Sequence, residues 1–168
     1  MRFTAVLLAI ALVMMALLTG GCESIAKKAV EDATGVSVDE SGDSVTITGD
    51  DGSSMEINSE EGKLASDFPT EVPLYDGEIR DSAGFKTDTG STFTATVGTE
   101  DSLDDVKAFY EDELAKDGWK IVYSADSSSG NDRMLSYSAE NADWSITVTG
   151  SLNDGETQVV VMVATKQE

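Results

Sequence analysis

The stretch Thr157-Gln158-Val159-Val160-Val161-Met162-Val163-Ala164-Thr165 is apolar on both sides of an extended chain, because Val159 to Val163 includes no polar residue. A strand with this composition is typical of the middle of a sheet, where both faces are covered. The turn sequence Asn153-Asp154-Gly155 directly precedes it and predicts a hairpin. We therefore expect the C-terminal strand to be central, with a helix covering one face of the sheet.

The covering helix is predicted to begin after Ser102, which stands at the N-cap position. Asp104 and Asp105 follow in the first turn, where acidic side chains favour the helix dipole. Lys116 is expected in the last turn, and Gly118 is expected to end the helix. One apolar stripe recurs at helical spacing and consists of Leu103, Val106, Phe109, Tyr110 and Leu114.

Alternating apolar and polar residues predict strands on both sides of this helix. The expected strands are Glu78 to Phe85, Thr92 to Val97, Trp119 to Ser124, Met134 to Ala139, Trp144 to Thr149 and Thr157 to Thr165. Two precede the helix and four follow it. The sequence therefore predicts an antiparallel sheet with one helix packed on a face, in the order β-β-α-β-β-β-β.

Three shorter alternating runs precede that unit, at Val36 to Val38, Val45 to Thr48 and Met55 to Ile57. They predict a three-stranded antiparallel meander, which we expect to cover part of the second face of the sheet. A short helix is predicted before it from the recurrence of Ile25, Ala29 and Ala33, with Val30 beside them and Gly35 beyond. The predicted fold class is α+β. The predicted division is residues 1–21, a signal peptide; 22–66, a lipidated N-terminus with the short helix and meander; and 67–168, an α+β domain.

The N-terminus has the pattern of a secretory signal. Arg2 precedes an uninterrupted apolar run from Ala5 to Leu18, and small residues follow it. The run is shorter than the roughly 20 residues of a membrane-spanning helix and falls in the range of a signal peptide.

The residues Leu18-Thr19-Gly20-Gly21-Cys22 resemble the lipobox of bacterial lipoproteins. The resemblance implies cleavage after Gly21 and attachment of a diacylglyceryl group to the thiol of Cys22. Two acyl chains give stable membrane attachment, whereas one gives only marginal binding. We therefore expect a protein of the cell envelope, anchored to the outer face of the membrane through Cys22. We also expect a monomer whose further partner is an unidentified envelope protein or ligand.

The composition of the 168 residues excludes several classes of site. Asp and Glu number 32 against 11 Lys and Arg, for a net charge of −21, and the chain has no His and one Cys. Without histidine there is no Ser-His-Asp or Cys-His catalytic group and no imidazole ligand for zinc. The acidity argues against nucleic acid, whose binding depends on Lys and Arg. No phosphate-binding glycine loop or dinucleotide fingerprint is present, so no cofactor is expected.

A second resemblance covers the chain from Phe68 onward. The pattern Phe68-Pro69-x-x-Val72-Pro73-x-Tyr75, followed later by Phe109-Tyr110-x-x-x-Leu114-x-x-x-Gly118-Trp119, is similar to a domain of bacterial secreted proteins and lipoproteins of unknown function. The resemblance implies the α+β fold and brings no assigned activity.

Two kinds of acidic site are alternatives. The turns Asp39 to Asp43, Gly49 to Gly52 and Ser59 to Gly62 are rich in oxygen ligands and could bind calcium weakly, although Asp-Gly and Glu-Gly pairs are also ordinary turn residues. A carboxylate-dependent hydrolase would need two acids held close together with one desolvated, and no pair stands out.

Four aromatic residues on predicted strands could form a recognition surface or fill the core: Trp119, Tyr123, Tyr137 and Trp144. The preferred hypothesis is a lipid-anchored extracytoplasmic protein that binds or scaffolds and is not an enzyme. A weak calcium-binding envelope module comes second, and a carboxylate-dependent hydrolase third.

Overall fold

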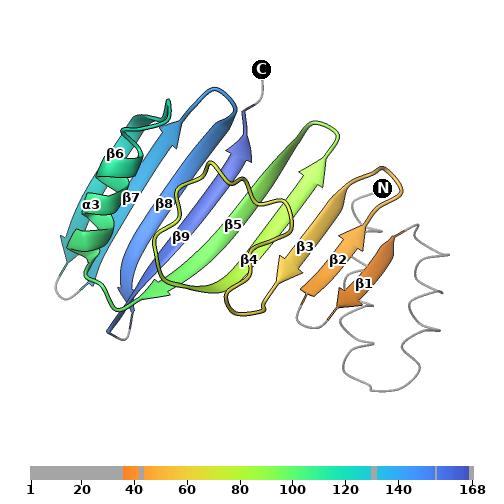
Figure 1. Ribbon diagram of the computed structural model, residues 1–168, viewed down its shortest axis with the longest axis horizontal. Coiled ribbons are helices and arrows are strands. Elements are labelled where there is room, and N and C mark those ends of the chain that lie inside the picture. The colour runs from red at the N-terminus through yellow and green to blue at the C-terminus, as the bar shows by residue number, and fades with distance from the viewer. Residues whose placement is uncertain (1–35, 42–43, 130–131, 154, 167–168) are drawn as a thin grey trace.

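The computed structural model describes residues 36–41, 44–129, 132–153 and 155–166. These ranges form nine strands and one helix: β1 (Ser37–Ser41), β2 (Ser44–Thr48), β3 (Ser54–Asn58), β4 (Glu78–Thr87), β5 (Gly90–Thr99), α3 (Leu103–Glu113), β6 (Lys120–Ser129), β7 (Asp132–Glu140), β8 (Trp144–Asn153) and β9 (Glu156–Thr165). All nine strands belong to one antiparallel sheet in the order β1-β2-β3-β4-β5-β9-β8-β7-β6 (Figure 1).

The C-terminal strand lies in the interior of the sheet, as its sequence predicts. β9 pairs with β5 on one side and with β8 on the other. Val159, Val161 and Val163 are fully buried on one face, which we call the inner face. Val160 and Met162 point to the opposite, outer face and remain exposed, Met162 to 46%. The expectation that both faces of this strand are covered is therefore wrong for the outer face.

The core consists of rows of side chains that run across the inner face from strand to strand. Register places Phe93, Val163, Ile146 and Ala139 in one row, Ala95, Val161, Val148 and Tyr137 in the next, and Val97, Val159, Gly150 and Leu135 in the third. All of the non-glycine side chains in these rows are buried. On the outer face the same strands carry mostly Thr and Ser, so this part of the sheet has one apolar side and one hydrated side.

Two segments cover the inner face. Helix α3 crosses the β6 to β8 side, where Tyr110 stacks on Tyr137 with ring centroids 6.5 Å apart. The connection between β3 and β4, residues 59–77, crosses the face over β4, β5 and β9 in Figure 1. Its Phe68 packs edge-on against Phe93 at 5.9 Å. The helix therefore supplies only part of the cover, and a loop supplies the rest.

Helix α3 begins where its sequence indicates. The hydroxyl of Ser102 accepts from the backbone N–H of Asp105, and the carboxylate of Asp105 accepts from the backbone N–H of Ser102, which completes a capping box. Leu103, Val106 and Tyr110 are the buried stripe. The helix ends at Glu113, so Lys116 lies beyond the last turn in which it was expected.

The predicted fold class is wrong. The chain is mostly β, with one large sheet and one eleven-residue helix, and is not an α+β fold preceded by a separate meander. The three short strands do not cover the second face of the sheet, because β3 pairs edge to edge with β4 from Ser54 and Lys86 to Asn58 and Ser82. This pairing satisfies the backbone groups of both edges, so the meander adds three strands to the edge of a sheet formed by the six strands β4 to β9.

The predicted signal peptide, the cleavage site at Gly21, the lipid attachment at Cys22 and the short helix from Ile25 to Ala33 lie outside the described residues. Within the part of the chain that is described, no helix has the length and apolarity to cross a bilayer.

Candidate functional site

The segment from Phe68 to Tyr75 is fixed at several points on the inner face. Val72 is buried in the core. The carboxylate of Glu71 accepts a hydrogen bond of 2.6 Å from the indole Nε1–H of Trp144. The ring of Tyr75 packs edge-on against Phe109 of α3 at 5.1 Å, and its hydroxyl donates to Asp101 at 2.8 Å. The sequence pattern that begins at Phe68 thus contacts directly the second pattern, which begins at Phe109.

The chain turns sharply after α3, and this turn places Trp119 next to the segment that contains Pro73. Asp117 and Gly118 both have left-handed backbone conformations, with φ of 52° and 79°. Aspartate and glycine are residues that tolerate this conformation. The turn is closed by a hydrogen bond of 3.1 Å from the backbone N–H of Trp119 to the carbonyl of Lys116. As a result Trp119 is largely buried, beneath the segment that contains Pro73.

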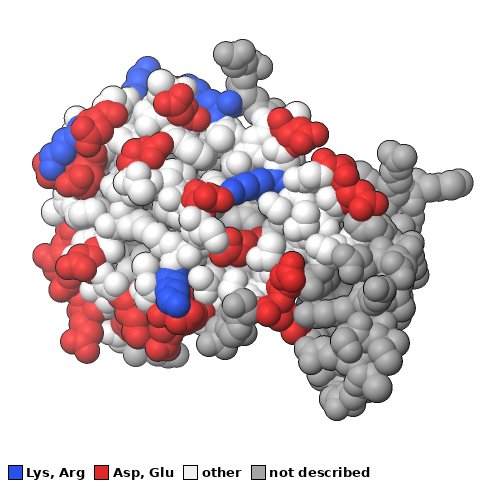
Figure 2. Space-filling view, turned by 45° about the vertical axis from the view of Figure 1, so that its right-hand side comes forward, with Lys and Arg blue, Asp and Glu red and all other residues white. Residues whose placement is uncertain are grey.

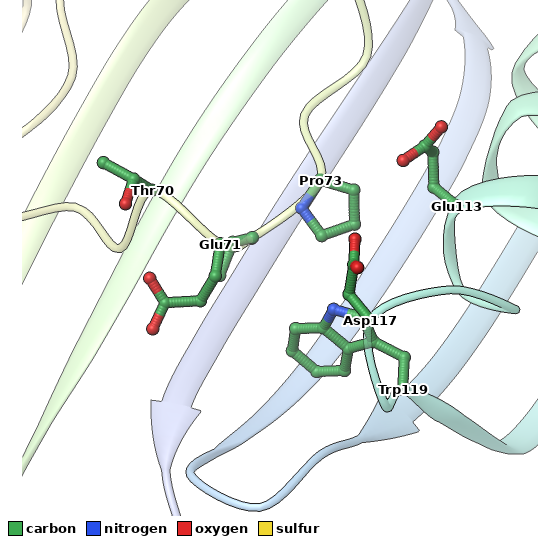
Figure 3. A pocket seen from close by; sticks show the side chains of 7 residues that line it. Thr70, Glu71, Pro73, Glu113, Asp117 and Trp119 are labelled. Carbon is green, nitrogen blue, oxygen red and sulfur yellow. The ribbon is translucent and has the colours of Figure 1, made fainter.

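A cavity of about 200 Å³ lies between these two segments. It is lined by Thr70, Glu71, Val72, Pro73, Glu113, Asp117 and Trp119. In Figure 3 the ring of Pro73 faces the indole of Trp119, Asp117 lies beside that indole, and the carboxylate of Glu71 points away from Pro73. The pocket therefore has an apolar floor made of two rings and an acidic rim.

The charge of the rim is entirely negative. Of its carboxylates, Glu71 is engaged by Trp144, and Glu113 forms an ion pair of 3.0 Å with Lys116. Asp117 has no hydrogen bond or ion pair with any described residue. No Lys or Arg lines the cavity. On the side of the molecule seen in Figure 2, Asp and Glu are spread widely with few Lys and Arg among them. The pocket is thus suited to a positively charged group that also has an apolar part.

Two tyrosines lie beside this site, Tyr110 buried and Tyr75 half-buried. Burial, together with the hydrogen bond to Asp101, raises the pKa of Tyr75 to about 12. Burial also raises the pKa of Tyr110 well above its usual range, and the backbone N–H of Tyr75, which lies near this hydroxyl without completing a hydrogen bond of good geometry, offsets only part of that rise. The hydroxyl of Tyr110 is fully buried and has no hydrogen-bond partner among the described residues. Tyr110 thus carries an unsatisfied polar group in the core beside the pocket.

The four aromatic residues expected from the sequence do not form one surface. Trp119 and Tyr137 are buried, and Trp144 is half-buried against Phe93. Tyr123 lies apart from them, exposed on the outer face of the edge strand β6. The core interpretation therefore holds for three of the four, while Trp119 both packs and lines the pocket.

The acidic turns do not form a cation site in the described residues. No three carboxylates or other metal-ligating side chains converge there. In the turn from Gly49 to Gly52, the carboxylate of Asp51 instead accepts from the backbone N–H and the hydroxyl of Ser53, which lowers the pKa of Asp51. Glu60 forms an ion pair with Lys63 at 2.7 Å. These contacts are those of ordinary turn residues.

Sequence reasoning named Trp119 and missed Glu71, Glu113 and Asp117 as pocket residues. Glu113 lies on the exposed side of the helix, and Asp117 has the position of a turn residue before glycine. Nothing in their spacing indicates a site. The one usable signal is the pair of patterns around Pro73 and Trp119, whose residues meet across the inner face.

Comparison with known families gives a match to this chain. The model of the START domain-like family matches residues 79–167, which is more than half of the chain and runs from β4 through β9. Glu113, Asp117 and Trp119 lie within the matched region, whereas Thr70 to Pro73 precede it. A comparison with curated proteins finds no match to this chain.

Proposed function

The chain belongs to the START domain-like family, and from this premise we propose that it is a non-catalytic binding protein of the cell envelope. Domains of this family are generally ligand-binding and not catalytic, which supports the proposal. The observation that carries it is the cavity between Pro73 and Trp119, the place in the described residues where aromatic, apolar and charged side chains converge on an open space.

The ligand is a cationic group about the size of a side chain. A cavity of about 200 Å³ is smaller than the roughly 300 to 1,000 Å³ of typical small-molecule sites. It therefore takes one end of a larger molecule. The indole face of Trp119 attracts a cation, and the carboxylates of Glu113 and Asp117 supply charge-assisted acceptors. A lysine or arginine side chain of a peptide, or an amine of similar size, meets these requirements.

The binding test uses N-acetyl-arginine amide and, as a matched neutral control, N-acetyl-citrulline amide. The protein has two tryptophans, so NMR resolves one indole N–H signal in the pocket and one at Trp144. We expect the arginine compound to shift the Trp119 signal and to leave Trp144 nearly unchanged, and we expect the neutral compound to do neither. Asp117→Asn should weaken the response. Equal responses to the two compounds, or no response at Trp119, would refute the cationic site.

The envelope location rests on the sequence around Cys22, and we propose that a lipid on this thiol anchors the protein to the outer face of the membrane. The acidic body is repelled by anionic lipid head groups, so attachment depends on the anchor. Replacing Cys22 by Ser should move the protein out of the membrane fraction, while Ser59→Ala, far along the chain, should leave it there. Continued membrane association of Cys22→Ser would contradict the anchor.

A further inference from the structure

The segment that forms one wall of the pocket has no backbone hydrogen bond to the sheet or to α3 in the described part of the chain. We call this segment, residues 68–75, the strap. The backbone N–H of Phe68 donates to the carbonyl of Ala65 at 3.0 Å, within the same loop. The N–H of Val72 donates to Pro69 at 3.3 Å, within the strap itself. The two prolines of the strap have no N–H to donate. The strap is therefore attached to the protein through its side chains.

The chain on both sides of the strap is fixed to the sheet. Before it, the backbone N–H of Ala65 donates to the hydroxyl of Ser82 on β4 at 3.0 Å. After it, Gly77 passes so close to β5 that a methyl group on this residue would lie 2.6 Å from the carbonyl oxygen of Gly98. The strap thus has two fixed ends, and the part between them has the few backbone contacts that are typical of segments that open locally.

Side-chain hydrogen bonds fasten the strap at two exposed positions. The indole of Trp144 donates to Glu71 at 2.6 Å, and the hydroxyl of Tyr75 donates to Asp101 at 2.8 Å. Water competes for a carboxylate acceptor at an exposed position, so neither hydrogen bond holds the strap strongly.

The core beneath the strap favours its opening. The hydroxyl of Tyr110 is buried near the backbone N–H of Tyr75, and no hydrogen bond of good geometry reaches it from the described residues. A buried polar group without a partner destabilises the state that buries it. Because Tyr75 belongs to the strap, movement of the strap away from the inner face lets water reach this hydroxyl. The closed strap therefore has a cost that the open strap does not have.

The charges around the pocket act in the same direction. Glu71 and Pro73 of the strap form one wall, and Glu113 and Asp117 contribute to the opposite wall, as Figure 3 shows. Carboxylates on two sides of a narrow space repel each other, and the repulsion is largest when the strap is closed. A cation between the walls removes this repulsion, and it contacts both walls only when the strap is closed.

We infer that the strap is a lid. It opens from the inner face while the sheet stays folded, exposes the hydroxyl of Tyr110 to water, and closes on the cationic ligand. The inference deepens the proposed function, on which it rests for the ligand but not for the movement. A ligand that contacts both walls binds the closed form better than the open form, so it shifts the strap toward closure.

The movement is tested by the rate at which iodoacetamide labels a buried cysteine in the full chain carrying Cys22→Ser, which removes the native thiol. Val72→Cys reports on the strap, and Val161→Cys, fully buried on β9, is the matched control. A buried thiol reacts in proportion to the population in which it is exposed. We expect Val72→Cys to react more than about tenfold faster than Val161→Cys and with little dependence on urea, whereas labelling of Val161→Cys should rise steeply with urea.

Hydrogen exchange of the Val72 and Val161 amides in the unsubstituted chain repeats this comparison without any effect of new cysteines on folding. The Val72 amide should exchange by openings that urea hardly changes, and the Val161 amide by unfolding. Equal rates and equal urea dependence at the two positions would mean that the strap moves only when the protein unfolds, and would overturn the inference.

Two substitutions test what holds the lid. Tyr75→Phe removes the hydrogen bond to Asp101 and should speed the labelling of Val72→Cys about fivefold, whereas Tyr110→Phe removes the cost of closure and should slow it about fivefold. If Tyr110→Phe slowed only Val161→Cys, the hydroxyl would stay buried when the strap opens, and the inference would be wrong.

The ligand is tested with the same two compounds as the pocket. N-acetyl-arginine amide should slow the labelling of Val72→Cys, and N-acetyl-citrulline amide should not. A shift of the Trp119 indole signal without slower labelling would overturn the lid, because the ligand would then bind without closing the strap. If neither the Trp119 signal nor the labelling responds, the cationic site is refuted, and the comparison of Val72→Cys with Val161→Cys still decides whether the strap opens.

Discussion

The hydroxyl of Tyr110 gives the sharpest test of the core beside the pocket. It is fully buried, and no hydrogen bond of good geometry reaches it from the described residues, so folding removes it from water with little compensation. A buried polar group left unpaired costs about 1 to 3 kcal/mol. Tyr110→Phe removes that group and keeps the ring, including its stacking on Tyr137 and its edge-on contact with Phe109 at 5.0 Å.

The gain is reduced by the small space that the oxygen leaves. A void of about 10 to 15 Å³, at about 24 cal/mol per Å³, costs about 0.3 kcal/mol. The net expectation is that Tyr110→Phe raises the free energy of unfolding by about 1 kcal/mol. For a domain of this size the melting temperature should rise by about 4 °C.

Tyr75→Phe is the matched control, because its hydroxyl donates to Asp101 at 2.8 Å. The same chemical change should here lower the free energy of unfolding by about 1 kcal/mol. The two substitutions therefore have opposite expected signs, although both remove one phenolic oxygen from neighbouring rings. Urea unfolding followed by tryptophan fluorescence measures both, with unchanged m-values as the check that the unfolded state is unaffected.

The reasoning is refuted if Tyr110→Phe destabilises the protein by as much as Tyr75→Phe does. That result would mean that the hydroxyl of Tyr110 has a partner in solution, such as an internal water molecule, and that the region beside the pocket is hydrated.

Three further predictions concern the sheet, an ion-pair cluster and the turn before the pocket. Val161→Ala, at a fully buried position of β9, should lower the free energy of unfolding by about 2 kcal/mol in urea titrations, whereas Met162→Ala on the exposed face should change it by less than about 0.5 kcal/mol. Hydrogen bonds, first from Arg133 and then from Lys107, hold the pKa of Asp126 far below its usual range. The ionised carboxylate therefore stabilises the folded state above a pH of about 4. This contribution to stability is lost as the pH falls through the pKa of the folded state. Arg133→Gln should accordingly raise the pKa of Asp126 in an NMR titration, and the stability difference from the parent protein should narrow between pH 7 and pH 2; a constant difference would contradict the assignment. Gly118→Ala should cost about 1 kcal/mol through backbone strain at φ 79°, since its new methyl group would meet no atom within 4 Å, and it should reduce the NMR response of the pocket.

Local features of this protein follow from its sequence alone. The N-cap at Ser102 and the apolar stripe of α3 depend on neighbours within a few residues, and the structure has both as expected. The central place of β9 in the sheet also follows from the sequence. The run from Val159 to Val163 contains no polar residue, so the strand needs neighbouring strands on both edges and a layer that covers at least one of its faces. The export and anchoring signals around Cys22 are likewise local, and they stay predictions.

The architecture did not follow, for reasons that involve contacts distant in the sequence. Alternation shows which residues of β3 share a face but not which face meets the core. That choice is made by the loop at residues 60–67, which needs the polar side chains of Glu56, Asn58 and Ser82 on the inner face. The choice turns the apolar residues of the meander outward and lets β3 pair with β4, so two predicted units become one sheet.

For the candidate site, too, the sequence predicts some of the residues, and the tertiary structure decides how they come together. The sequence marked Trp119 as one of four aromatic residues on predicted strands, and it marked Pro73 as part of the pattern that begins at Phe68. Only tertiary structure placed them against each other, although they are 46 residues apart in the chain, with Asp117 on the rim. Short-range spacing determines helices, turns and strand faces because those depend on neighbouring residues. The pocket and the position of the strap depend on which surfaces meet, and the packed chain alone decides that.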